Sequence, residues 1–186
     1  KGKLPKAKAF VATTSDEILA AAGSKFCPVS LADCLKSLEI NKRYAVVGLP
    51  CRIYGLRKLS EFNAKIKGSI CLYLGLLCGG MPSYLGTEYI LRIYNMENRF
   101  ITRFEYCGGG WPRRLLIQSK ILGKQIEISA PYPDYWRGAF QFFLPYRCMI
   151  CYDWFNEFSD ISLGGARLSH INKYEQGASL IIVRTG

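Results

Sequence analysis

Hydrophobic positions along this chain follow two periods, one helical and one extended. In "SLADCLKSLEI", Leu31, Leu35 and Leu38 recur at helical spacing, which predicts a helix with one apolar face. Continuous apolar runs such as "ICLYLGLLC" (70–78) predict strands buried on both faces. The first half is predicted to contain strand 9–13, helix 14–23, helix 30–40, strand 43–49, helix 50–59, strand 69–77 and helix 82–94.

The second half of the chain has a different pattern. Alternating strands and helices, as in the first half, are typical of a parallel α/β sheet. Later, Ile126, Ile128 and Ala130 alternate with polar residues, which predicts antiparallel strands. These later strands are predicted at 101–106, 113–119, 124–130, 160–165 and 179–184. We therefore expect an α/β fold with one mixed sheet, formed as a single domain over residues 1–186.

No segment predicts membrane insertion or export. The longest apolar run is well short of the roughly 20 residues that span a bilayer. No apolar segment follows the basic N-terminus, as it would in a signal peptide. The chain begins without Met and ends in a strand-like "LIIVRTG", which suggests a fragment of a longer protein. We expect a cytoplasmic location and no membrane span.

Charge narrows the choice of partners. Lysine and arginine number 25 against 14 acidic residues, a net charge of +11, which favours anionic partners such as a phosphorylated cofactor or an acidic protein. A missing acidic neighbour domain would explain the same excess. The basic residues are dispersed and no predicted helix carries a basic stripe, so nucleic acid is not an expected partner.

Eight cysteines give the chain its candidate chemistry, and their surroundings differ. Cys34 on a helix stripe and Cys71 inside a strand are expected to be small core residues. Cys51 and Cys78 instead follow the predicted strands 43–49 and 69–77 directly. Parallel α/β sheets place ligands at this edge, so the two thiols are expected side by side there.

Cys148 and Cys151 form a CxxC pair in "YRCMIC". With Cys51 and Cys78 they supply four thiolates from three loops, a donor set that suits zinc or an iron–sulfur cluster. Both iron and zinc bind soft thiolate ligands, so the ligand type alone does not distinguish an iron site from a zinc site. The only histidine, His170, is interpreted as an ordinary surface or loop residue.

Five stretches, in order, resemble one known family. They are "GSKF" (23–26), "VVGLPCRIYGLRKL" (46–59), "LGLLCGGMPS" (74–83), "FEYCGGGWP" (104–112) and "RCMICYDWFNEFSDISLGGA" (147–166). The chain from about residue 9 onward resembles the beta subunit of coenzyme F420 hydrogenase/dehydrogenase, in its C-terminal domain. That family pattern has G-S-K-Y, V-G-T-P-C-Q, a strand ending in Cys, G-N-G-W-P, R-C-x-x-C-x-D and A-D-I-S-x-G-D.

The resemblance implies an enzyme, an oxidoreductase subunit that contains FAD and a 4Fe–4S cluster. It would transfer electrons between a hydride carrier such as coenzyme F420, its candidate substrate, and a partner subunit, ferredoxin or substrate. The resemblance implies that the metal ligands are Cys51, Cys78, Cys148 and Cys151. It also implies that the flavin-site residues are Ser24, Lys25, Gly110 and Trp111. It assigns no catalytic residue and leaves the oligomeric state open.

Several positions depart from the family pattern. Leu49 replaces the usual Thr, Arg52 the usual Gln, and Gly165 a common Asp, while Cys107 and Gly109 alter the loop before Trp111. Two alternatives therefore stand beside the electron-transfer hypothesis. One is a binding or assembly module held together by zinc, without catalysis. The other is a member that keeps the fold but not the cofactors.

Overall fold

A computed structural model describes residues 4, 6–121, 124–166 and 177–184. Its internal contacts divide the chain into two compact units. The first unit contains residues 1–30 and 80–149, and the second contains residues 31–79 and 150–186. The single domain over residues 1–186 stays a prediction. Within the described parts of the chain, no helix is long and apolar enough to cross a membrane.

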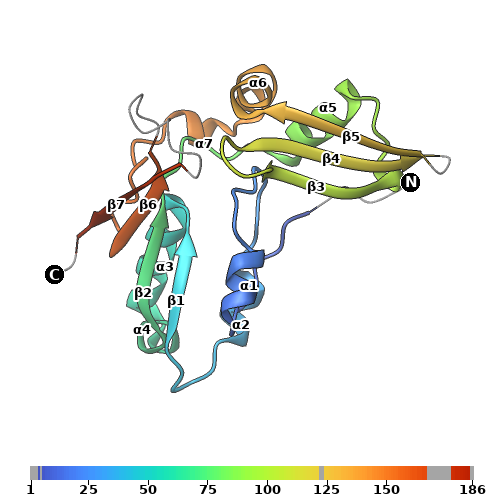
Figure 1. Ribbon diagram of the computed structural model, residues 1–186. Helices are drawn as coiled ribbons and strands as arrows, with labels where there is room; N and C mark the ends of the chain where they lie inside the picture. Colours follow the sequence, from blue (N-terminus) through green and yellow to red (C-terminus); the bar gives the residue numbers. More distant parts are fainter. Residues whose placement is uncertain (1–3, 5, 122–123, 167–176, 185–186) are drawn as a thin grey trace. The chain divides into compact units, whose positions relative to one another are not determined.

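The second unit is built on a four-stranded sheet (Figure 1). The strand order is β1-β2-β6-β7; β1, β2 and β6 run parallel, and β7 pairs antiparallel with β6. The elements of this unit are α2 (Ala32–Ser37), β1 (Tyr44–Gly48), α3 (Pro50–Phe62), α4 (Ala64–Ser69), β2 (Ile70–Leu76), β6 (Ile161–Gly165) and β7 (Ser179–Val183). The parallel strand–helix pattern expected for the first half is therefore confirmed.

Helices α3 and α4 pack against β2 and form the core of this unit. Pro50 begins α3, where its fixed φ suits a helix and its missing N–H costs no hydrogen bond. Ile53 and Leu56, one turn apart, turn inward from α3 and are almost completely buried. They meet Ile70 and Tyr73 of β2. The apolar stripe of α3 thus packs against the sheet that contains β1, the strand directly before this helix.

The strand β2 is less buried than its sequence predicts. Only one of its faces carries the α3–α4 core, and Cys71 and Leu76 are exposed. The pairing of β1 with β2 contains an irregularity, because Tyr44 pairs with Ile70 while the next residue, Ala45, pairs with Leu72. Cys71 is the unpaired extra residue, and a bulge of this kind turns a side chain away from its regular direction. The expected core role of Cys71 is therefore wrong, and Cys34 is only half-buried.

Residues 153–162 return the chain to this sheet through hydrogen bonds made by side chains. Asp160 accepts the backbone N–H of Tyr73 at 2.7 Å and pairs with Arg57 at 2.6 Å. Arg57 also lies over the ring of Tyr73, 3.9 Å from its centroid. Arg184, just after β7, donates to the buried hydroxyl of Ser162 at 2.6 Å. These contacts join the strand β6, which is distant in sequence, to the unit formed by β1, β2 and α3.

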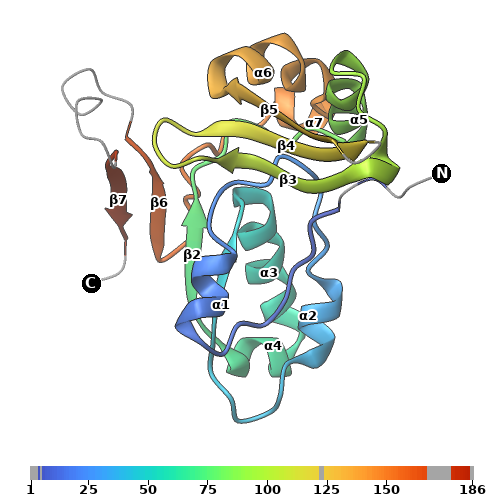
Figure 2. The same cartoon turned by 45° about the vertical axis from the view of Figure 1, so that its right-hand side comes forward.

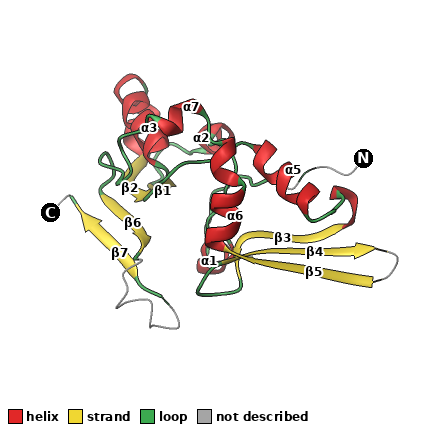
Figure 3. Cartoon of the chain, turned by 90° about the horizontal axis from the view of Figure 1, so that it is seen from above, coloured by secondary structure: helices red, strands yellow, loops and turns green. Residues whose placement is uncertain are grey.

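The first unit is built on a separate three-stranded antiparallel sheet, β3-β4-β5, with helices α5 and α6 beside it (Figures 2 and 3). Its elements are α1 (Ser15–Ala20), α5 (Tyr84–Ile93), η1 (Asn98–Phe100), β3 (Ile101–Gly108), β4 (Arg114–Ile121), β5 (Lys124–Pro131), α6 (Tyr132–Gly138), η2 (Phe140–Phe143) and α7 (Tyr146–Met149). The predicted α/β class with parallel and antiparallel strands is confirmed, but the strands form two sheets rather than one.

Aromatic side chains fill the core of this unit. Phe140 is completely buried, and Phe26 packs against Trp136 with ring centroids 4.9 Å apart. Leu115 and Ile117 of β4 point into the same cluster, in the alternation expected for a sheet covered on one face. The aromatic region after residue 130 had no predicted structure. It forms α6 and η2 because its rings bury against the sheet.

One predicted strand is wrong. Residues 9–13 form no strand, and Phe10 and Val11 remain exposed. A strand needs a neighbour to satisfy its backbone groups, and the segment pairs with none of the described strands.

Replacing Asp160 with Ala is expected to lower the free energy of unfolding by about 1–3 kcal/mol, because the Tyr73 N–H and the Arg57 guanidinium lose their acceptor. Chemical denaturation of the purified chain measures this difference. Glu39→Ala is the matched control, since its ion pair with Lys42 is exposed and is expected to contribute less than about 1 kcal/mol. Equal losses in the two variants would contradict the assignment.

Candidate functional site

Two strand ends of the second unit lead directly to cysteines. Gly48 at the end of β1 pairs in register with Gly75 near the end of β2. Cys51 lies three residues beyond Gly48, and Cys78 lies three residues beyond Gly75. Because β1 and β2 are parallel neighbours, both cysteines follow the same edge of the sheet, as the sequence predicts.

The two cysteines have different environments. Cys51 is in the first turn of α3 and is exposed. The residue before Pro50, Leu49, occupies the N-cap and makes no side-chain hydrogen bond to the helix. Cys78 is half-buried, and its backbone N–H donates to the carbonyl of Trp154 at 3.0 Å. This last bond connects the end of β2 to the segment that follows the CxxC pair.

Cys151 begins that segment, and local hydrogen bonds shape the turn around it. The Trp154 indole N–H donates to the Cys151 carbonyl at 2.9 Å, and the Cys151 thiol lies 3.7 Å from the Asp153 carbonyl. The buried carboxylate of Asp153 accepts the Glu157 N–H at 3.0 Å. Asp153 therefore has the turn-forming role expected for a short acidic side chain in a loop.

Asn156 connects this turn to both strand ends. Its side-chain amide donates to the Gly48 carbonyl at 2.9 Å and to the Leu76 carbonyl at 3.3 Å. The residue is completely buried and has a φ of 60°. A Cβ on Gly75 would lie 2.5 Å from Asn156 Cγ, so only glycine at position 75 leaves room for this amide. Sequence reasoning missed Asn156, because nothing local distinguishes it from a turn asparagine.

The predicted ligands fall on both sides of the unit boundary. Cys51, Cys78 and Cys151 belong to the second unit, whereas Cys148 lies in α7 of the first, where its N–H donates to the Pro145 carbonyl at 2.8 Å. None of the four forms a disulfide within the described part of the chain. Across the described ranges, no three His, Cys, Asp or Glu side chains are placed to hold a single metal ion. His170 lies outside the described residues.

All four cysteines provide the same kind of ligand atom, a thiol sulfur. Four thiols, once deprotonated, provide the ligands that a 4Fe–4S cluster or a Cys₄ zinc site requires. Cys51 and Cys78 follow directly paired glycines, and Cys151 begins the segment that Asn156 ties to the same two strand ends. The residue types and this shared sheet edge fit such a group.

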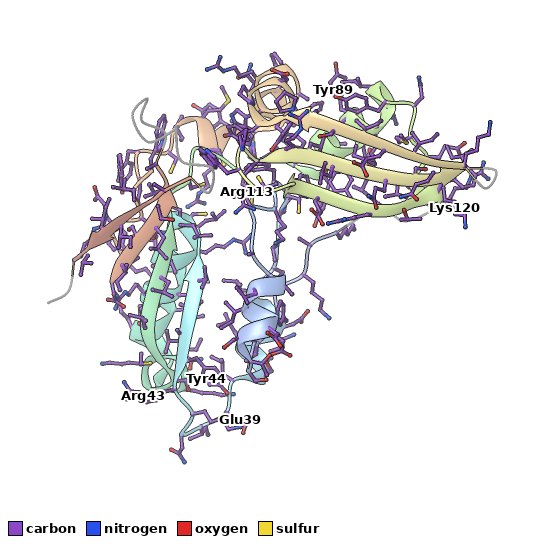
Figure 4. The ribbon with its side chains drawn as sticks, in the orientation of Figure 1. Glu39, Arg43, Tyr44, Tyr89, Arg113 and Lys120 are labelled. Carbon is purple, nitrogen blue, oxygen red and sulfur yellow. The ribbon has the colours of Figure 1, made fainter. Side chains whose placement is uncertain are left out.

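The predicted flavin residues lie in the first unit, in two neighbouring segments. Gly23, with a φ of 88°, begins the G-S-K segment after α1, and a Cβ placed on it would lie 3.3 Å from the Cys107 carbonyl. Arg113 donates to that same carbonyl at 3.2 Å. The G-S-K segment and the loop between β3 and β4 are therefore close together. Figure 4 labels Arg113 at this end of the sheet and Lys120 toward the other end.

Lys25 already has partners within the protein. Its ammonium group donates to the carbonyls of Ala21, Ala22 and Gly23 at 2.6, 2.8 and 2.8 Å. An ammonium has three protons, so these carbonyls, which belong to the C-cap of α1 and the two residues after it, use all of them. Loss of hydration lowers the pKa of Lys25, while the nearby Cys107 and Glu105 act in the opposite direction. Ser24 is exposed beside it.

Gly110 and Trp111 lie in the loop between β3 and β4. Gly109 and Gly110 both have a positive φ, 73° and 75°, and the Trp111–Pro112 peptide is cis. A Cβ on Gly110 would meet no atom within 4 Å, and Trp111 is half-buried. The backbone of the loop is thus accessible next to an indole ring, an arrangement that a planar aromatic ligand can approach closely.

Behind this loop lies a buried network of hydroxyl groups. The Tyr135 hydroxyl donates to the Tyr106 carbonyl at 2.6 Å and lies 3.7 Å from the Cys107 thiol. The Tyr106 hydroxyl pairs with that of Thr87 at 2.7 Å, and burial raises the pKa of Tyr106. This tyrosine therefore stays neutral, and its hydroxyl holds α5 to β3.

Comparison with known proteins finds similarity over the whole chain. Residues 41–186 match the family described as the C terminus of the "Coenzyme F420 hydrogenase/dehydrogenase, beta subunit", and residues 1–36 match the family described as its N-terminal part. The coenzyme F420-dependent sulfite reductase of Methanocaldococcus jannaschii is 25% identical over 195 residues. That match covers 97% of this chain and 28% of the relative, so the chain spans little more than a quarter of the relative's length.

The fold also matches a solved structure. All of this chain aligns with 60% of a chain in the F420-reducing [NiFe] hydrogenase complex from Methanosarcina barkeri, solved as a xenon derivative. The TM-score is 0.66 at 20% sequence identity, so this likeness concerns the fold. The family matches and the motifs 23–26, 46–59, 74–83, 104–112 and 147–166 point the same way, and the chain belongs to the coenzyme F420 hydrogenase/dehydrogenase beta subunit family.

Proposed function

We propose that this chain is the cofactor-carrying part of an oxidoreductase subunit that exchanges electrons between coenzyme F420, or a similar hydride carrier, and a partner protein or substrate. Family membership supports the general class. The names of the sulfite reductase and hydrogenase relatives both refer to F420, which supports this coenzyme as the candidate substrate. The dispersed excess of positive charge, +11, is compatible with an anionic coenzyme or an acidic electron-transfer partner.

The observation that carries the proposal is the paired edge in the second unit. Cys51 and Cys78 follow the in-register glycines Gly48 and Gly75. The Cys78 N–H and the amide of Asn156 connect this edge to the segment that begins at Cys151. Two thiols thus follow one sheet edge, and hydrogen bonds connect the segment that begins at the third, Cys151, to the same edge. We assign them, with Cys148, as ligands of a 4Fe–4S cluster.

FAD is proposed to bind in the first unit, beside the G-S-K segment and the loop between β3 and β4. Trp111 would stack against the flavin ring, and the open backbone at Gly110 would permit close approach. Ser24 is available as a hydroxyl donor. Lys25 would act through the carbonyls it binds, by holding the turn that presents Ser24. A phosphate of the cofactor that displaced those carbonyls would meet the positive charge of the Lys25 ammonium group.

When bound, a flavin and a cluster together convert hydride transfer into single-electron steps, which is chemistry that no side chain supplies. The contribution of this chain is to hold and shield the two groups. The thiolates set the charge of the metal site, and Trp154 and Asp153 shape the turn around Cys151. The buried Tyr106–Thr87 pair stabilises the sheet behind the flavin loop.

Anaerobically purified protein is expected to contain roughly four iron and four sulfide per chain, with broad absorption near about 400 nm. Replacing Cys51 with Ser should abolish most of this iron, because a serine hydroxyl is a poor ligand for the cluster. Iron, acid-labile sulfide and zinc analysis measure the result. Cys71→Ser is the matched control: Cys71 is also an exposed thiol of the second unit but lies at the opposite end of β2.

Zinc without labile sulfide in the wild-type chain would contradict the cluster and favour the zinc-binding alternative. Unchanged iron in Cys51→Ser would exclude this residue as a ligand. Protein that holds neither metal nor flavin would support a member that keeps only the fold.

Replacing Trp111 with Ala is expected to weaken FAD binding about tenfold, the loss expected when one aromatic stacking contact is removed. Fluorescence titration of the apo-protein with FAD measures it, and Trp111→Phe should restore most of the affinity. Phe62→Ala, at an exposed aromatic residue of the second unit, is the control and should leave FAD affinity unchanged. Wild-type affinity in Trp111→Ala would remove this residue from the flavin site.

A further inference from the structure

We propose that Asn156 is the positioning residue that holds the cysteine-bearing strand ends in register for the metal site. The inference rests on the proposed function and deepens it, because it names a residue that acts through the ligands without being one. Asn156 lies five residues after Cys151. Its first acceptor, Gly48, lies three positions before Cys51, and its second acceptor, Leu76, lies two positions before Cys78.

The first argument is the pair of hydrogen bonds. A primary amide has two N–H donors, and Asn156 directs this group at the Gly48 carbonyl on β1 and the Leu76 carbonyl on β2. One planar group therefore spans two neighbouring strands where their pairing with each other ends. Beyond this point the ladder between β1 and β2 ends, since Gly48 and Gly75 form its last pair. The amide takes over the linkage just before each cysteine.

The second argument is that Asn156 is unfavourable by itself. It is a non-glycine residue with a positive φ, its side chain is completely buried, and its Oδ1 accepts no hydrogen bond among the described residues. Buried polar atoms normally have partners, and features that weaken a fold are concentrated at functional positions. A glycine would satisfy the backbone at lower cost, so the amide itself must account for the residue.

The third argument is that neighbouring residues are arranged around this side chain. Gly75 leaves the space that Asn156 fills, because a Cβ there would lie 2.5 Å from Asn156 Cγ. The Ser159 hydroxyl donates to the Asn156 carbonyl at 2.7 Å, and the Ser162 hydroxyl lies 2.8 Å from that of Ser159. These buried hydroxyls hold the backbone of Asn156 while its side chain holds the strands. Outer residues that orient ligands in this way typically change metal affinity by about 10- to 100-fold.

Two substitutions separate the amide from the backbone. Asn156→Gly keeps the positive φ and removes the side chain, and Asn156→Asp keeps the shape but, when ionised, has no side-chain hydrogen-bond donor. Asn41→Asp is the matched control, since Asn41 is in the same unit, has a φ of 71° and is exposed. Circular dichroism first establishes which variants fold.

The first measurement needs no cofactor. In anaerobic apo-protein, a short bifunctional thiol reagent is expected to cross-link Cys51 to Cys78 in the wild type and in Asn41→Asp. The yield should fall to roughly half or less in both Asn156 variants, because the two strand ends are no longer joined. Peptide mass spectrometry identifies the linked pair. No Cys51–Cys78 link in the wild type, or equal yields in all four proteins, would overturn the proposal.

The second measurement uses protein reconstituted with iron and sulfide. Both Asn156 variants are expected to bind iron about 10- to 100-fold more weakly than the wild type. Any cluster they retain should have a shifted reduction potential and a broadened electron paramagnetic resonance signal. Asn41→Asp should match the wild type in all three. Folded Asn156→Gly with wild-type affinity and potential would overturn the proposal, as would failure of both Asn156 variants to fold, which would assign the amide to stability alone.

The two measurements distinguish this inference from the proposed function. If the wild type takes up no iron, the proposed cluster is wrong, but the cross-linking result still decides whether Asn156 holds the strand ends. If the wild type holds its cluster and the Asn156 variants do too, the function stands and the positioning role fails.

Discussion

The hydrogen-bonding needs of two parallel strand ends organise the second unit. Where β1 and β2 diverge after the Gly48–Gly75 pair, their last carbonyls lose the donors that the ladder supplied. A segment more than 70 residues away provides replacement donors through the side-chain amide of Asn156, while the Asp160 carboxylate accepts the Tyr73 N–H further back along β2. The strand β6 then joins β2 immediately afterwards. The same bonds that satisfy the sheet thus set where the chain after the CxxC pair must lie, which links the stability of the fold to the geometry of the candidate metal site.

Stability and ligand geometry are separated within this return segment. Asp160 makes strong, charge-assisted contacts with Arg57 and with the backbone of Tyr73, near the middle of the sheet. Asn156 makes weaker, neutral hydrogen bonds at the edge, next to the cysteines. Losing the Asp160 contacts weakens the attachment of β6. Losing the Asn156 hydrogen bonds changes the spacing of the two segments that carry Cys51 and Cys78. A site that binds a large cofactor needs contacts like those of Asn156, because the position in which they hold the ligands matters more than the strength of each hydrogen bond.

Much of the fold could be predicted because its signals are local. Pro50 begins a helix, the apolar residues of α3 recur at helical spacing, and β5 alternates visibly. The edge position of Cys51 and Cys78 followed from the order of strands and helices. What failed depends on pairing between distant segments. The bulge at Cys71 arises from the register of β1 against β2, and Asn156 gains its role only when β6 joins the sheet. Lys25 looked free for a ligand because the carbonyls it binds, at the C-cap of α1 and just after it, come together only in the folded turn.

The departures from the family pattern have different physical meanings. Gly109 replaces Asn at a φ of 73°, a conformation that both residues adopt, so the loop before Trp111 keeps its shape. Leu49 replaces Thr at the N-cap of α3, which removes a side-chain cap, and the Arg52 N–H donates instead to the Leu49 carbonyl at 2.9 Å. Gly165 replaces Asp at the end of β6, where a Cβ would meet nothing within 4 Å, so crowding does not explain the loss. The changes at Leu49 and Arg52 flank the proposed ligand Cys51, and the lost cap together with a positive charge at position 52 makes the start of α3 more favourable for a negatively charged group.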